Sequence, residues 1–322
     1  MTASSLPRHA LRALAAAILG TALLAGCGGG TSQVDQFIPA RILSLGDELN
    51  YLTDDGHKYT VNAVDSTSGA VVCTTSPLWI QQVSANRYGK LFSQCPGTGT
   101  SPDLTAYRLS TVGARVDDVV GVVSGRLASG GFTDTDLVTV LVGLHDVLDQ
   151  YALYDGTNEA DLIAALQAKG TKLASTVNSI TATGARVLVS TTIDVGLTPY
   201  AAQQKTDVGD DRPALLTRLT DAFNTAMRLD LVNDGSKIGL LLADDLSRAM
   251  HRVPANYSLG TVDKGACLEA YWGTPNCTTK TLLAAASSNA STYLWADQLH
   301  PGTVFHYYLG TQAATRLNNL PF

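Results

Sequence analysis

The C-terminal part of the chain carries an aspartate and a histidine at a spacing that suits proton transfer. Asp297 and His300 are separated by two residues, and Pro301 follows them. A carboxylate beside an imidazole fixes its tautomer and stabilises its charged form, so that the ring can accept and return a proton. On its own this spacing is only a weak signal for such a pair. The alternative is an aspartate that caps a helix starting near Pro301, next to a surface histidine.

A second group of interest follows an apolar run near the N-terminus. Residues 41–45 read as a first β-strand, and Gly46, Asp47 and Glu48 come directly after it. A glycine-led turn between a strand and a helix is a common place for a nucleophile or a bound anion, because the helix N-terminus presents free N–H groups. This position therefore predicts a functional side chain.

The tetrapeptide Gly-Asp-Glu-Leu at 46–49 resembles the Gly-Asp-Ser-Leu motif of the GDSL, or SGNH, hydrolases, with Glu48 where that family has its serine. The segment 295–301 resembles the last block of the same family. The resemblance implies that His300 is the general base and that Asp297 orients it. Further similarities, including the segments 79–82, 194–200 and 222–224, extend over most of the chain.

Two further blocks imply an oxyanion hole. Gly143-Leu144-His145-Asp146 stands where the family has a Gly-x-Asn-Asp block, so His145 replaces an asparagine that donates to the oxyanion. An imidazole N–H can also donate, although a histidine that merely fills the space is the alternative. Residues 111–115 resemble the block whose glycine, here Gly113, offers a backbone N–H. A glycine would equally suit a tight turn at this point.

Glu48 cannot replace a serine as an alkoxide-like attacker, because it is already an anion at neutral pH and a weak nucleophile toward esters. Its longer side chain is expected to fill the oxyanion pocket and to form an ion pair with His300 that favours imidazolium. One alternative is that Glu48 acts as the base for a water with His300 as the acid. Another is that Asp47, Glu48 and Asp146 hold a metal. The family implies no metal and no cofactor.

Two function classes therefore remain open. The first is an ester hydrolase that acts on acyl or acetyl esters of lipids or glycans with a non-standard site at Glu48. The second is an inactive pseudo-hydrolase that binds an ester-like or glycan ligand at the cell envelope. We expect a monomer. The net charge of −6, without clusters of basic residues, argues against a nucleic-acid partner.

The first 26 residues predict an export signal, because two arginines precede an apolar run that is short for a membrane span. Residues 24–27, Leu-Ala-Gly-Cys, resemble the bacterial lipoprotein cleavage box, which implies lipidation of Cys27. Residues 27–38 would then be a flexible tether. We expect an exported lipoprotein at the periplasmic face or the surface of the outer membrane. Ordinary secretion with a chance cysteine is the alternative.

Four further cysteines predict disulfide bonds, because even numbers in exported proteins usually pair. Cys73, Cys95, Cys267 and Cys277 allow three pairings, of which we favour the sequence-local one, 73–95 with 267–277. A zinc site is the alternative, but no Cys-x-x-Cys pattern supports it.

The pattern after the tether alternates strands and helices and predicts one domain over residues 39–322. Strands are expected at 41–45, 136–142, 185–193 and 237–243, and helices at 79–88, 160–183, 212–232 and 301–317. Such alternation favours a parallel α/β sheet with helices on both faces. The resemblance to the SGNH hydrolases implies the three-layer, flavodoxin-like form of this arrangement. Residues 54–72 suggest a small hairpin and residues 261–279 a long loop. Ligands of such sheets bind at the carboxyl ends of the strands.

Overall fold

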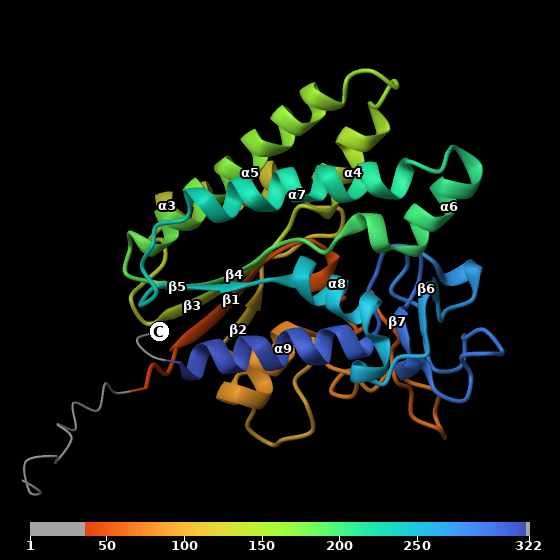
Figure 1. Cartoon of the computed structure of the whole chain (residues 1–322). Coiled ribbons are helices and arrows are strands. Elements are labelled where there is room, and N and C mark those ends of the chain that lie inside the picture. Colours follow the sequence, from red (N-terminus) through yellow and green to blue (C-terminus); the bar gives the residue numbers. More distant parts are fainter. Residues whose placement is uncertain (1–35, 320–322) are drawn as a thin grey trace, which may run out of the picture. The chain divides into compact units, whose positions relative to one another are not determined.

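The structure, a computed structural model, describes residues 36–319, which pack around one main hydrophobic core. Five parallel strands form the central sheet in the order β2-β1-β3-β4-β5 (Figure 1). This order is that of flavodoxin-like sheets, and it confirms the expected α/β class. The strands are β1 Arg41–Gly46, β2 Ala106–Arg108, β3 Asp136–Leu141, β4 Arg186–Ser190 and β5 Ile238–Leu241.

Helices cover both faces of this sheet, which explains why its inner strands are almost continuously apolar. Every residue of β3 is buried. One face carries α3, α4, α5 and α7, and the opposite face carries α9 (Figure 1). The helices are α2 Trp79–Gln81, α3 Val116–Ala128, α4 Leu144–Ala152, α5 Glu159–Thr181, α6 Pro199–Asp207, α7 Arg212–Asp230, α8 Ala243–Arg252 and α9 Thr303–Asn318.

The long helices α5 and α7 pack closely because a glycine lies at their contact. A Cβ atom at Gly170 of α5 would come within 2.3 Å of the Phe223 carbonyl oxygen in α7. A glycine is therefore required at this position for the two helices to approach so closely. The aromatic ring of Phe223 in turn packs against Gly143, just after β3. Helix packing thus reaches the carboxyl edge of the sheet.

The chain after β1 differs from the expected helix. Only one 3₁₀ turn, Glu48–Asn50, follows the strand. The side-chain amide of Asn50 donates to the carbonyl oxygens of Leu45 and Leu141, and its oxygen accepts from the Trp79 indole. These bonds hold the turn against the strand ends, so the chain leaves the sheet without a longer helix.

Three other predicted segments also differ in detail. The helix expected at 79–88 continues beyond α2 as a π-helical stretch, Gln82–Arg87. The hairpin expected at 54–72 is reduced to the isolated bridges Leu52–Lys58 and Val64–Val71. In this segment the buried ammonium group of Lys58 donates to three backbone carbonyl oxygens between residues 73 and 76, which ties the loop down without strand pairing.

The segment expected as a loop at 261–279 begins with a strand. β6 Thr261–Gly265 pairs in parallel with β7 Tyr293–Trp295 in a second, two-stranded sheet. Two disulfides, Cys73–Cys95 and Cys267–Cys277, join the sequence-local pairs. The second disulfide is part of a smaller apolar cluster beside this sheet.

The predicted leader at 1–26 and Cys27 lie outside the described residues. Within residues 36–319, no helix combines the length and the apolar character needed to cross a bilayer.

Candidate active site

The sequence-predicted residues come together at the carboxyl edge of the sheet. Glu48 follows β1, Gly113 lies in the loop between β2 and α3, and His145 lies in the first turn of α4 directly after β3. Asp297 and His300 lie in the loop between β7 and α9. Four separate segments therefore meet at one point, as expected for a doubly wound sheet.

The carboxylate of Glu48 is the centre of this cluster. Its Oε1 atom lies 2.6 Å from Nε2 of His145 and 3.2 Å from Nε2 of His300. Its Oε2 atom accepts a hydrogen bond of 2.9 Å from the backbone N–H of Gly113. Because the glutamate is an anion, both imidazole Nε2 atoms act as donors. The residue is only 2% exposed, so these three donors replace its hydration.

The charges of the cluster shift the pKa values of its central pair in opposite directions. Burial disfavours the Glu48 anion and would raise the pKa of this carboxyl. The hydrogen bonds from His145 and His300 outweigh burial, so they hold the pKa of Glu48 well below its usual range. Burial likewise disfavours His300 imidazolium, but Asp297 and Glu48 raise the pKa of His300 to about 10. His300 is therefore protonated at neutral pH and cannot serve as a base in this state.

Asp297 orients His300 as the resemblance implies. Its Oδ2 atom lies 2.7 Å from Nδ1 of the ring, while Oδ1 accepts from the backbone N–H groups of Leu299 and His300. Oδ2 also accepts from the backbone N–H of Gly273, in the loop closed by the second disulfide. Burial opposes the Asp297 anion, but the His300 charge and these hydrogen bonds lower the pKa of Asp297.

Gly113 supplies its N–H through a backbone conformation that favours glycine. Its φ angle is +72°, and a Cβ atom there would meet nothing within 4 Å. The requirement is therefore conformational and not steric. The turn aims the N–H at Glu48 just before α3 begins.

Asp47, which its place in the turn after β1 makes a candidate oxyanion- or ligand-binding residue, caps that turn. It is fully buried, and its Oδ1 atom caps the turn by accepting from the Leu49 N–H. Its Oδ2 atom has no hydrogen-bond partner among residues 36–319. Burial, reinforced by the neighbouring Glu48 charge, raises the pKa of Asp47 well above its usual range. A protonated Asp47 would fit this environment.

Asp146 is likewise a capping residue, because its Oδ2 atom accepts from the Val116 N–H at the start of α3. The described part of the chain contains no group of three or more His, Cys, Asp or Glu side chains arranged to hold a metal ion. In the structure, Asp47 and Asp146 instead accept from the backbone N–H groups of Leu49 and Val116.

Two further residues support the site without any signal in the sequence pattern. The Tyr59 ring packs 5.1 Å from the His300 ring, centroid to centroid. Gly273 donates to Asp297 from a loop more than twenty residues earlier in the chain. Both come from segments with irregular structure, where periodicity gives no information about which residues approach the site.

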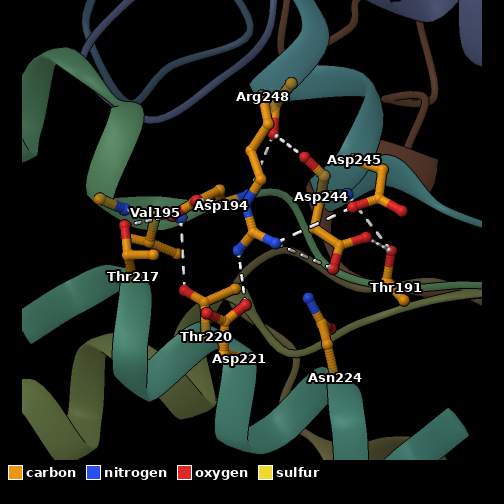
Figure 2. A network of polar contacts seen from close by, with 12 residues as sticks. Thr191, Asp194, Val195, Thr217, Thr220, Asp221, Asn224, Asp244, Asp245 and Arg248 are labelled. Atoms are coloured by element: carbon orange, nitrogen blue, oxygen red, sulfur yellow. Dashed lines mark hydrogen bonds and ion pairs between the residues drawn. The ribbon is translucent and has the colours of Figure 1, made fainter. Parts of the chain in front are cut away.

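A polar network behind the site fixes the segment that follows β4. The Arg248 guanidinium on α8 contacts Asp194 at 2.7 Å and Asp221 at 2.5 Å, and it lies 3.9 Å from Asp244 (Figure 2). Asp194 begins the turn that leads into α6, where the Tyr200 N–H donates to the carbonyl oxygen of Gln298. The network thus connects α7 and α8 to a segment that holds the Asp297–His300 loop.

Comparisons with known proteins find distant structural similarity only. No protein-family model matches the chain, and no curated protein sequence matches it. Among solved structures, a lipase from a goat rumen metagenome is similar with a TM-score of 0.48 and 10% identity, over 86% of this chain and 96% of that one.

Two other solved structures are similar to a comparable degree. A lipolytic protein of the G-D-S-L family from Veillonella parvula gives a TM-score of 0.43 and 8% identity, over 87% of this chain and 99% of that one. An acetylxylan esterase from Geobacillus stearothermophilus gives a TM-score of 0.43 and 14% identity, over 88% of this chain and 96% of that one. Identities this low say nothing about which reaction the present chain performs.

Proposed function

We propose that this chain is an ester-hydrolase-type protein of the SGNH kind, directed at acyl or acetyl esters of a lipid or glycan, and that Glu48 holds its site in a closed, non-hydrolytic state. One observation carries the proposal. The Glu48 carboxylate accepts hydrogen bonds from the Gly113 N–H, the His145 Nε2 and the His300 Nε2 at the same time. Hydrolysis of an ester would need the same groups, with Gly113 and His145 as oxyanion donors and His300 as the base.

With a hydroxyl at position 48, the same groups would be arranged for ester hydrolysis. Nε2 of His300 would accept the hydroxyl proton while the oxygen attacks the ester carbonyl carbon. Gly113 and His145 would donate to the oxyanion, and His300 would return its proton to the leaving alcohol. Water would then release the acid by the same steps. Glu48 prevents this sequence because it provides no such hydroxyl and keeps His300 protonated.

A second candidate is slow hydrolysis with Glu48 as the base for a water and His300 as the acid. The 3.2 Å contact between Glu48 and His300 favours it, because the two groups stand where a proton could pass between them. The low pKa of Glu48 makes this carboxylate a weak base, so we expect any such rate to be small.

Hydrolysis of nitrophenyl acetate and nitrophenyl butyrate tests these alternatives on wild type, Glu48→Ser, Glu48→Ala and His300→Ala. We expect no activity in wild type and a gain in Glu48→Ser. Loss of a serine nucleophile costs up to about 10⁶ in kcat in a serine protease, so a gain of roughly 10²-fold would be readily detected. Wild-type activity that disappears in both Glu48→Ala and His300→Ala would contradict the closed state and support the second candidate. The absence of hydrolysis in all four proteins would contradict the proposal that this chain has the scaffold of an ester hydrolase.

A further inference from the structure

A groove of about 410 Å³ lies beside the loop that carries Asp297 and His300. Gln298, between those two residues, is part of its lining. Helix α6 forms one wall, and β6 with the loop of the second disulfide forms the other. α6, β6 and the disulfide loop contribute no donor to the Glu48 carboxylate among the described residues, but the groove shares the loop of Gln298 with His300.

The walls of the groove are in direct contact with the Asp297–His300 loop. A Cβ atom at Gly265 of β6 would lie 2.7 Å from the Asp297 Cα, so strand and loop touch there. The Gly273 N–H, from the disulfide loop, donates to Asp297 at 3.0 Å. On the other wall, the Tyr200 N–H at the start of α6 donates to the Gln298 carbonyl at 3.0 Å. A ligand in the groove would therefore lie against the loop that carries His300.

The groove combines one fixed aromatic ring with a rim of polar side chains. The half-buried Trp272 indole is held in place because its Nε1–H donates to the Cys267 carbonyl oxygen at 3.0 Å. The exposed rim carries Asp263, Lys264 and Glu269. A sugar ring fits this combination, because its C–H face packs on an aromatic ring while its hydroxyls bond to carboxylate, ammonium and amide groups.

An acyl chain fits this groove less well. Burying hydrocarbon against Asp263, Lys264 and Glu269 would remove water from three charged groups without giving them hydrogen-bond partners. Apolar lining residues such as Pro199 and Leu283 are present, but they do not form a continuous apolar channel with the charged rim around them. The chemistry of the lining therefore favours the sugar part of a ligand over its lipid part.

We propose that this groove binds the sugar rings of an acyl-substituted glycan and places the ester beside the Glu48–His300 cluster. The position of the ester rests on the function proposed above, whereas the binding of the sugar rings does not. Sugar binding with wild-type protein would occur even if Glu48→Ser proved inactive. The two ideas therefore fail separately.

Tryptophan fluorescence gives a direct test, because the chain has three tryptophans and only Trp272 is not fully buried. The purified chain in mild detergent is titrated with acetylated xylotetraose, with triacetylchitotriose and with dihexanoylphosphatidylcholine. We expect saturable quenching with at least one oligosaccharide and none with the phospholipid. Quenching by the phospholipid alone, or by no ligand, would overturn the proposal.

Calorimetry of three variants then shows whether Trp272 makes the contact. Trp272→Ala should weaken oligosaccharide binding about tenfold or more, as loss of an aromatic anchor usually does. Trp272→Phe keeps an aromatic face and should lose the fluorescence signal while binding persists. Tyr307→Ala removes a 58% exposed aromatic ring from α9, outside the groove, and should bind like wild type. Equal binding by Trp272→Ala and wild type would contradict the proposal.

Discussion

At the scale of single residues, Glu48 and His145 form one contact at the centre of the candidate site. The Oε1 atom of Glu48 lies 2.6 Å from Nε2 of His145. A buried carboxylate is tolerated only when donors or opposite charges replace its hydration. His145 supplies such a donor to Glu48. Together with Gly113 and His300, His145 therefore satisfies the buried Glu48 carboxylate.

The ion pair between Glu48 and His300 predicts a specific dependence of stability on pH. The folded-state pKa of His300 is raised to about 10 from its ordinary value of 6.5. The resulting stabilisation is fully present below pH 6.5 and is lost as pH rises toward 10, at up to about 1.4 kcal/mol per pH unit. We expect the free energy of unfolding of wild type to exceed that of Glu48→Gln most at neutral pH, with the difference shrinking toward pH 10.

Urea unfolding at several pH values between 6.5 and 10 measures this difference. Buried Lys58, whose pKa burial lowers to about 7, also titrates in this range, but it is present in both proteins and cancels from the comparison. A difference that stays constant across the range would contradict the ion pair.

The sequence was informative about the site only where a motif aligned several residues at once. The contacts of Glu48 with His300 and with Gly113 are those expected from the length of the side chain and the position of the turn. The unpartnered oxygen of Asp47 and the donor from Gly273 were not foreseeable. Both depend on how distant loops pack, and no local pattern records that packing.

At the scale of elements, charged side chains from α7 and α8 stabilise the segment leading to α6. Arg248 contacts buried Asp194 and the more exposed Asp221. Burial disfavours the guanidinium charge, but these two carboxylates outweigh it and raise the pKa of Arg248. Asp194 also accepts from the Gly196 N–H and the Thr217 hydroxyl. One aspartate thus joins the end of β4, the next turn and α7.

Removal of Arg248 should therefore be costly. Arg248→Ala leaves Asp194 with a buried charge and no cation, and a broken buried pair costs about 3 kcal/mol or more in the free energy of unfolding. Arg218→Ala is the matched control, because its pair with Glu159 is largely exposed and should cost about 1 kcal/mol or less. Chemical denaturation of both variants measures the difference. Equal losses would show that the network in Figure 2 adds nothing beyond a surface pair.

Prediction of elements succeeded where apolar runs were long and failed where a short element depended on its neighbours. The buried strands β1, β3, β4 and β5 were recognisable from their apolar residues. β2 has only three residues, one of them the exposed Tyr107, and it exists because β1 offers a free edge. α3, α4, α6 and α8 were not assigned either; α8 is short and strongly polar on one side. β6 was missed because its partner β7 lies nearly thirty residues away.

At the scale of the whole molecule, the site and the groove both lie at ends of segments that the sheet brings together. Lipidation of Cys27 remains a prediction, supported by the resemblance of residues 24–27 to a lipoprotein cleavage box. A lipid anchor close to the start of the domain would keep the protein at an envelope surface. There it would meet glycans and lipids rather than soluble metabolites.

Detergent partitioning tests the anchor. The wild-type chain expressed in a Gram-negative host should enter the detergent-rich phase, because lipid chains bind micelles at about 0.8 kcal/mol per buried CH₂ group. Cys27→Ser should move to the aqueous phase or stay unprocessed, whereas Ser32→Ala should behave like wild type. Incorporation of labelled palmitate identifies the modification. Unlabelled wild-type protein in the aqueous phase would contradict the anchor and leave ordinary secretion.

The most direct test of the closed site is covalent labelling with a fluorophosphonate, read by intact mass. This reagent needs a hydroxyl nucleophile, a base to activate it and an oxyanion hole to accept its P–O group. We predict no adduct on wild type, one adduct on Glu48→Ser, and none when His300→Ala is added to that variant. The pattern would establish a complete ester-hydrolase site that a single carboxylate keeps closed. An adduct on wild type, or no adduct on Glu48→Ser while its fold is intact, would contradict the account.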